Sequence, residues 1–250
     1  MSYQVDLTNC DREPIHIPGK IQSHGFLIAV NSKSYNISYV SQNIEGYTGV
    51  NATGLLGKNI TELEDQLAIA SDTASLQQLL NLAKGSKNSD TINPLAIDVK
   101  GTNYNLIISH STNDLVLEFE PTESDLGYDI QKTIGRSVAE ILSGKNLSAL
   151  LQNAAFEIKK IINYDRVMIY KFNEDGHGEV TAEVKNDGLE PFLGLHYPAS
   201  DIPKQARELY KINLTRIIAD VNSEGSAIIT YEEGAAPLDL THSALRAVSP

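Results

Sequence analysis

Cys10 is the one residue whose side chain could bond covalently to a small electrophile, and it is the only cysteine in the sequence. A thiol reacts once it becomes a thiolate and is accessible, and Cys10 lies between two polar residues, Asn9 and Asp11, where burial is not forced. A lone cysteine is more often a small buried side chain, so Cys10 taken by itself favours a structural role. A single cysteine excludes an internal disulfide and every metal site built from several cysteines.

Charged residues near the end of the chain could bind a carboxylate. Arg216 and Arg246 carry planar guanidinium groups, which are the best side-chain partners for carboxylates, although single arginines are usually solvated. A second polar group lies in the segment Tyr197 to Pro203, where Ser200 or Asp201 could cap a helix that Pro203 opens. From the residues alone, the capping role is favoured over catalysis.

No enzyme signature is present, so we expect no catalytic residue and no metal site in this segment. Gly-Lys occurs at 19–20, 57–58 and 144–145, but no serine or threonine follows it, as a phosphate-binding loop requires. The sequence has no HExxH, GxSxG or kinase catalytic loop, and no pair of its six histidines is spaced four residues apart.

Composition narrows the possible partners of the 250-residue chain. A net charge of -12 argues against nucleic acid, which requires a basic surface, and against docking on anionic lipid. No apolar run approaches the ~18 residues that span a bilayer, and the polar N-terminus lacks the pattern of a signal peptide. We therefore expect a cytoplasmic protein.

Hydrophobic periodicity predicts two α+β domains with antiparallel strands. In the first domain, Leu115, Leu117 and Phe119 should face the core, and Glu118 and Glu120 should lie on the opposite face. The expected strands are 26–30, 36–41, 95–99, 104–110, 115–119, 166–172, 179–184, 215–221 and 227–231, and the expected helices are 71–83, 130–142, 147–162 and 204–210.

Three regions follow from this pattern. Residues 1–25 form an extended arm, 26–121 the first domain, and 122–250 the second, which looks incomplete at its C-terminus because no final strand or capping helix precedes Pro250.

The stretch from Leu7 to Gly19, followed by Ile21-Gln22 and His24-Gly25, resembles the N-terminal signature of bacteriophytochromes. The resemblance implies a PAS-like domain followed by a GAF domain, both with antiparallel sheets flanked by helices. It also implies that Cys10 forms a thioether with the A-ring vinyl group of biliverdin IXα, a linear tetrapyrrole (bilin). The arm would pass through a loop of the GAF domain in a figure-of-eight knot, with Ile21 plugging the loop.

The segment Pro-Ala-Ser-Asp-Ile-Pro at 198–203 resembles a GAF-domain motif of the same family. By this resemblance the Asp201 carbonyl faces the pyrrole nitrogens, and its side chain tunes chromophore protonation. Arg216 and Arg246 would each bind one propionate. The remaining chromophore contacts implied by the resemblance are Met168, Tyr170, Val180, Phe192, Tyr197, Ser200, Ile202, Pro203, Tyr210 and Ser249. Of these, Tyr170 and Tyr197 would flank ring D, and Tyr210 and Ser249 would assist the arginines.

The function implied is a red/far-red photoreceptor that isomerises the C15=C16 bond of its bilin and signals to a downstream output, often a histidine kinase with a response regulator. A homodimer through the GAF helices is expected. Two alternatives remain open: a PAS–GAF module that binds another small ligand or none, and a thiol enzyme that uses Cys10.

Overall fold

The structure is a computed structural model that describes residues 12–70, 74–85, 93–122 and 130–247 of the chain. It divides into two compact units, one made of Met1–Ser124 with Lys204–Pro250 and the other of Asp125–Pro203. Each unit is described by itself. The domain boundaries expected near residues 25 and 121 stay a prediction. Among the described residues, no helix is long and apolar enough to cross a membrane.

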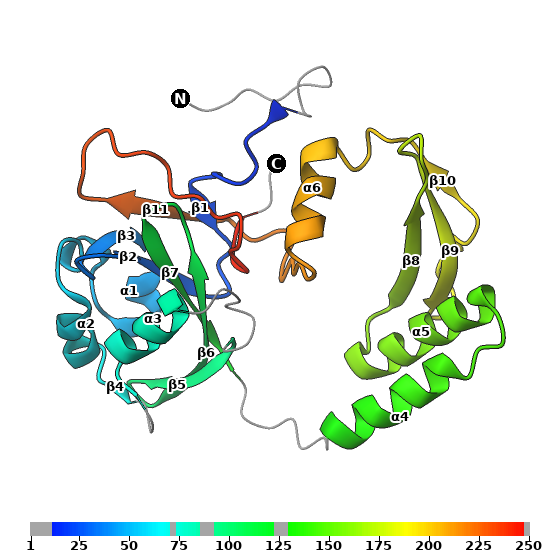
Figure 1. The fold of residues 1–250 in the computed structure, drawn as a ribbon, viewed down its shortest axis with the longest axis horizontal. Helices are drawn as coiled ribbons and strands as arrows, with labels where there is room; N and C mark the ends of the chain where they lie inside the picture. Colours follow the sequence, from blue (N-terminus) through cyan, green and yellow to red (C-terminus); the bar gives the residue numbers. More distant parts are fainter. Residues whose placement is uncertain (1–11, 71–73, 86–92, 123–129, 248–250) are drawn as a thin grey trace. The chain divides into compact units, whose positions relative to one another are not determined.

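The first unit is built on an eight-stranded sheet with the order β1-β11-β3-β2-β7-β6-β5-β4, in which every pairing is antiparallel (Figure 1). Five of the predicted strands are confirmed in this sheet, and 227–231 is confirmed as β11. The strands are β1 Lys20–Ile21, β2 Phe26–Asn31, β3 Ile37–Ser41, β4 Ile69–Ala70, β5 Leu95–Val99, β6 Thr102–His110, β7 Asp114–Pro121 and β11 Ser226–Thr230.

One face of this sheet holds the main core together with short helices. Phe26 on β2 stacks on Phe119 on β7 with ring centroids 4.6 Å apart, and Tyr104 on β6 meets both rings edge-on. Leu115, Leu117 and Phe119 lie in this core, as predicted. The helices are α1 Ile44–Thr48, η2 Ala52–Gly54, α2 Ile60–Gln66 and α3 Leu76–Gly85.

The second face of the sheet is also covered, which the sequence pattern did not predict. Leu27, Ala29 and Val116 on this face pack against Leu238, Leu240 and Leu245. Glu118 lies on the face opposite Leu115, Leu117 and Phe119, as predicted, and on that face it is 0% exposed. The covering segment lies about 120 residues further along the chain, so the alternating pattern of β7 could not indicate it.

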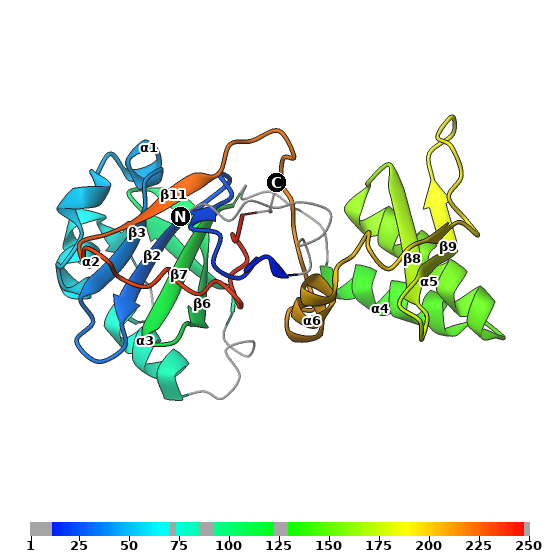
Figure 2. The ribbon, with the colours of Figure 1, turned by 90° about the horizontal axis from the view of Figure 1, so that it is seen from above.

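The second unit combines a helix pair with a small sheet. Its helices α4 Ile130–Leu142 and α5 Leu147–Ile162 have the predicted bounds, and its sheet contains β8 Arg166–Phe172, β9 Gly178–Lys185 and β10 His196–Tyr197. Helix α5 packs against β8 and β9, and α4 packs against α5 (Figure 2). The predicted hairpin between residues 166 and 184 is confirmed.

The chain from residue 204 onward belongs to the first unit. Helix α6 spans Lys204–Ile212 and follows Pro203, as predicted. The strand predicted at 215–221 is wrong, because this segment is irregular. Its backbone groups bond to a side chain instead of a neighbouring strand: Ile217 O and Ala219 N–H both bond to Gln22.

Replacing Phe119 by Ala should lower the free energy of unfolding of the first unit by about 3–5 kcal/mol, because a fully buried ring in a stacked pair leaves a cavity. Urea unfolding followed by far-UV circular dichroism measures the loss. Leu82→Ala is the control, since Leu82 is 60% exposed and should change the stability by about 0.5 kcal/mol or less. Equal losses in the two variants would contradict this assignment of the core.

Candidate functional site

The N-terminal arm is held by backbone hydrogen bonds on two sides. On one side Lys20 and Ile21 pair with Ala227 and Ser226 of β11. On the other side the Gln22 N–H donates to Leu245 O at 2.7 Å, and the Ala247 N–H donates to Lys20 O at 3.2 Å. Ile21, the predicted plug, is 0% exposed between these two segments. The threading of the arm through a closed loop stays a prediction.

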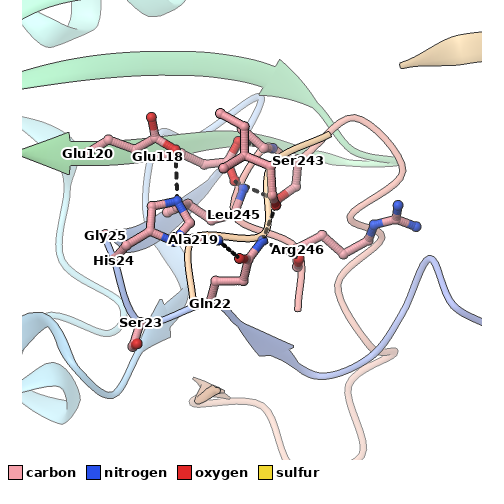
Figure 3. A network of polar contacts seen from close by, with 12 residues as sticks. Gln22, Ser23, His24, Gly25, Glu118, Glu120, Ala219, Ser243, Leu245 and Arg246 are labelled. Atoms are coloured by element: carbon pink, nitrogen blue, oxygen red, sulfur yellow. Dashed lines mark hydrogen bonds and ion pairs between the residues drawn. The ribbon is translucent and has the colours of Figure 1, made fainter. Parts of the chain in front are cut away.

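The Gln22 side chain ties three backbone groups together (Figure 3). Its amide nitrogen donates to Ile217 O at 2.8 Å and to Arg246 O at 3.2 Å, and its amide oxygen accepts from the Ala219 N–H at 3.1 Å. The side chain is buried, so these bonds replace water that the three groups would otherwise bind. Sequence reasoning assigned Gln22 no role, although the residue lies within the recognised motif.

Arg216 and Arg246 lie close together. Arg216 Nη2 donates to the backbone oxygen of Arg246 at 2.6 Å, and Arg246 Nη1 donates to Ile15 O in the arm at 3.2 Å. Tyr210 on α6 is near enough to act electrostatically on both guanidinium groups. The structure therefore brings together Ile21, Tyr210, Arg216 and Arg246, four of the predicted site residues.

Arg246 is buried and Arg216 is half-buried, and neither side chain has a carboxylate partner among the described residues. Burial, followed by the like charge of Arg216, lowers the pKa of Arg246 to about 10, and burial lowers the pKa of Arg216. Within the described part of the chain, neither arginine forms an ion pair, and Arg216 Nη1 and Arg246 Nε have no hydrogen-bond partner. Because a buried, unpaired cation is costly, this arrangement suits an anionic ligand that supplies the missing acceptors.

An aromatic cluster lies in the second unit. The ring of Tyr170 on β8 lies 6.1 Å from that of Tyr197 on β10 and meets Phe172 edge-on at 5.1 Å, measured between centroids. A Cβ atom at Gly178 would come within 2.0 Å of the Tyr170 ring. Gly178 therefore makes room for Tyr170, a role that sequence reasoning missed because the two residues lie on different strands.

Phe192 is positioned by an ion pair in the same unit. The guanidinium of Arg166 lies 3.7 Å from the centroid of the Phe192 ring and pairs with Glu183 at 3.2 Å. Glu183 also accepts from the backbone N–H groups of Phe192 at 2.9 Å and Leu193 at 3.1 Å. No local pattern indicated a role for Arg166 or Glu183, since the three segments meet only in the folded unit.

The remaining predicted residues of the second unit differ in exposure. Val180 is buried, whereas Ser200, Asp201 and Met168 are exposed. The Asp201 N–H donates to Pro198 O at 3.1 Å, which closes a turn ahead of Ile202 and Pro203. Cys10 and Ser249 lie outside the described residues.

The fold and these contacts define a PAS–GAF sensory module, and comparisons with known proteins agree. A family profile described as a PAS fold matches residues 10–122. The chain is 36% identical to cyanobacterial phytochrome B of Nostoc sp. over 99% of its own length and 33% of that protein. It is 34% identical to the bacteriophytochrome of Pseudomonas aeruginosa, over 98% of its own length and 33% of that protein.

Among solved structures, the chromophore-binding domain of the Stigmatella aurantiaca bacteriophytochrome matches with a TM-score of 0.85 and 32% identity, over 97% of this chain and 79% of that one. This chain belongs to the phytochrome family and corresponds to the PAS–GAF region of bacteriophytochromes. It spans about a third of the length of the curated relatives named above.

Gln22→Leu should lower the free energy of unfolding of the first unit by about 2–4 kcal/mol, because it leaves Ile217 O, Arg246 O and the Ala219 N–H without their partner. Hydrogen exchange should also become faster at the Ala219 amide. Gln77→Leu, at an exposed position of α3, is the matched control. Unchanged exchange at Ala219 would show that Gln22 does not hold this segment.

Proposed function

We propose that this chain is the bilin-binding sensory region of a red/far-red photoreceptor, with biliverdin IXα attached through Cys10. The observation that carries the proposal is the pair of the half-buried Arg216 and the buried Arg246, which lacks a carboxylate partner in the described residues of a phytochrome-family chain. Biliverdin carries two propionates, and guanidinium groups are the side chains best suited to hold carboxylates.

The arginines would bind the propionates through their free donors. Arg216 keeps Nη1 available while Nη2 donates to the backbone, and Arg246 keeps Nε available while Nη1 donates to the arm. The Tyr210 hydroxyl would assist from α6, and Ser249 from the segment after Arg246. Each propionate would then replace water and neutralise one guanidinium group.

The docked arm would bring the thiol to the ligand. Ile15 bonds to Arg246, and the Leu240 N–H donates to His16 O at 2.8 Å, so this part of the arm lies against the arginine segment. Cys10 lies five positions before Ile15, a reach of at most about 18 Å when extended. Addition of the Cys10 S–H across the A-ring vinyl group forms one C–S bond and one C–H bond, with no change of oxidation state overall.

When bound, the bilin supplies light absorption and isomerisation at C15=C16. We assign to Tyr170 and Tyr197 the contacts with ring D, and to the Asp201 carbonyl the contact with the pyrrole nitrogens. Gly178 would keep the Tyr170 ring in place. The other contacts of the second unit would be Met168, Val180, Phe192, Ser200, Ile202 and Pro203.

The wider assembly follows the same proposal. Helices α4 and α5 expose Ile134, Val138, Leu142 and Phe156, which supports a homodimer formed through these helices. The protein would act in the cytoplasm and would signal through an output region, such as a histidine kinase, to a response regulator.

Incubation with biliverdin tests the proposal directly. The expected result is a changed absorption spectrum, a reversible red/far-red difference spectrum, and zinc-induced fluorescence of the protein band on a denaturing gel. Cys10→Ala should abolish that fluorescence and leave reversible binding. An unchanged free-pigment spectrum would favour the alternative, a PAS–GAF module for another ligand.

Arg216→Ala should weaken reversible binding of biliverdin by about 10- to 100-fold, because it removes a charge-assisted hydrogen bond to a propionate. The measurement is the Kd in the Cys10→Ala background, by absorbance titration. Biliverdin dimethyl ester is the matched ligand: its carboxylates are masked, so the substitution should leave its Kd unchanged. Arg136→Ala, on the exposed side of α4, controls for net charge. An equal effect on acid and ester would contradict the propionate assignment.

A further inference from the structure

We propose that Glu118 is a positioning residue for Arg246: its buried carboxylate fixes the backbone of residues 243–245 and thereby sets where the Arg246 guanidinium meets an anionic ligand. The identity of that ligand rests on the function proposed above, whereas the positioning itself rests on contacts within the first unit.

The Glu118 carboxylate accepts hydrogen bonds from three consecutive residues of the covering segment (Figure 3). Its Oε1 accepts from the Leu245 N–H at 2.8 Å and from the Ser243 hydroxyl, and its Oε2 accepts from the Ala244 N–H at 2.9 Å. Both oxygens are used by groups immediately before Arg246. A carboxylate can accept all three bonds, whereas an amide would turn an NH₂ group toward one of the donors.

The strand that carries Glu118 is a rigid support. In β7, Glu118 pairs with Leu27 of β2 on one side and with Ile107 of β6 on the other. Beyond Leu245, the backbone oxygen of Arg246 is held by Gln22 and Arg216. The backbone of Arg246 is therefore held by Glu118 before it in the chain and by Gln22 and Arg216 at its own carbonyl, and its side chain is held by the bond from Nη1 to Ile15 O.

The charge of Glu118 makes this support sensitive to pH. Burial raises its pKa to about 6, and its three hydrogen bonds oppose the rise. The nearby charged groups are Glu120 on the same strand, which pairs with His24, and Arg216, while Asp239 and His242 are the titratable groups of the covering segment. Protonation turns one acceptor oxygen of Glu118 into an O–H group, which weakens or redirects the hydrogen bonds from these three donors.

The sign of the pH effect follows from two opposed contributions. Because the folded-state pKa is raised above 4.5, the stability that Glu118 contributes is present below that value and is lost as the pH rises through about 6. The affinity for the ligand should change with pH in the opposite direction and rise as the pH rises, because the ionised carboxylate accepts all three bonds that position Arg246. A purely electrostatic role would instead make anion binding tighter once Glu118 is neutral. The direction of the change in affinity therefore distinguishes positioning from simple charge.

Glu118→Gln tests the proposal in the Cys10→Ala background, with Glu120→Gln as the matched control. At pH 7.5 we expect Glu118→Gln to weaken the Kd for biliverdin by about fivefold, through the loss of one to two hydrogen bonds that orient Arg246. The chain with native Glu118 should lose a similar factor between pH 7.5 and 5.5, and the variant should show a flat profile. Biliverdin dimethyl ester should show neither effect.

A second readout needs no ligand. Hydrogen exchange at the Ala244 and Leu245 amides should become faster in Glu118→Gln and stay unchanged in Glu120→Gln. If the chain with native Glu118 binds no bilin, the proposed function fails, and the exchange rates still decide whether Glu118 holds the segment. A folded Glu118→Gln variant that binds biliverdin equally well or more tightly would overturn the positioning role.

If Glu118→Gln does not fold, Ser243→Ala tests the positioning role of Glu118 instead. This change removes one donor and leaves the carboxylate in place, and since that hydrogen bond lowers the pKa of Glu118, the midpoint of the pH profile should move upward. An unmoved midpoint would contradict the proposal.

Discussion

The antiparallel pairing of Lys20 and Ile21 with β11 is the constraint on which the rest of the first unit depends. Strand β11 also pairs with β3, so the arm and a segment from near the end of the chain together form one end of the eight-stranded sheet. The 245–247 segment binds the arm from the other side. Residues more than 200 positions apart thus share one backbone network, and the arginines are located by it.

This network explains how two buried charges, Glu118 and Arg246, can lie near the half-buried Arg216. Glu118, Arg216 and Arg246 would each be costly if isolated, and exchanging a buried pair for apolar residues is often neutral or stabilising. Here the charges do not pair directly: the carboxylate binds backbone N–H groups, and the guanidinium groups bind backbone carbonyls. The cations are thus oriented but not neutralised, which is the condition an anion-binding site requires.

Local sequence patterns predicted most helices and strands correctly, but they did not predict which distant segments these elements contact. Helices α4 and α5 have the predicted bounds because their apolar stripes and caps are local signals, such as Asn146 capping the Ala149 N–H. The burial of Glu118 and the irregular course of 215–221 were missed because both depend on segments about 120 to 200 residues away. Periodicity reports which side of a strand is apolar, but it cannot report that a polar side will be covered.

The same distinction applies to the site. The residues proposed to bind the ligand, Arg216 and Arg246 among them, could be named from their types and from the motifs around them. The residues that hold them, Gln22 and Glu118, could not, because a glutamine or a glutamate shows its role only when the groups it binds are known. Gly178 is the clearest case: a side chain at this position would collide with the Tyr170 ring, and only the folded structure shows that the two residues are neighbours. Supporting residues are therefore where a structure adds most to a family assignment: the motif identifies the ligand class, and the contacts explain why the ligand-binding groups stay in place.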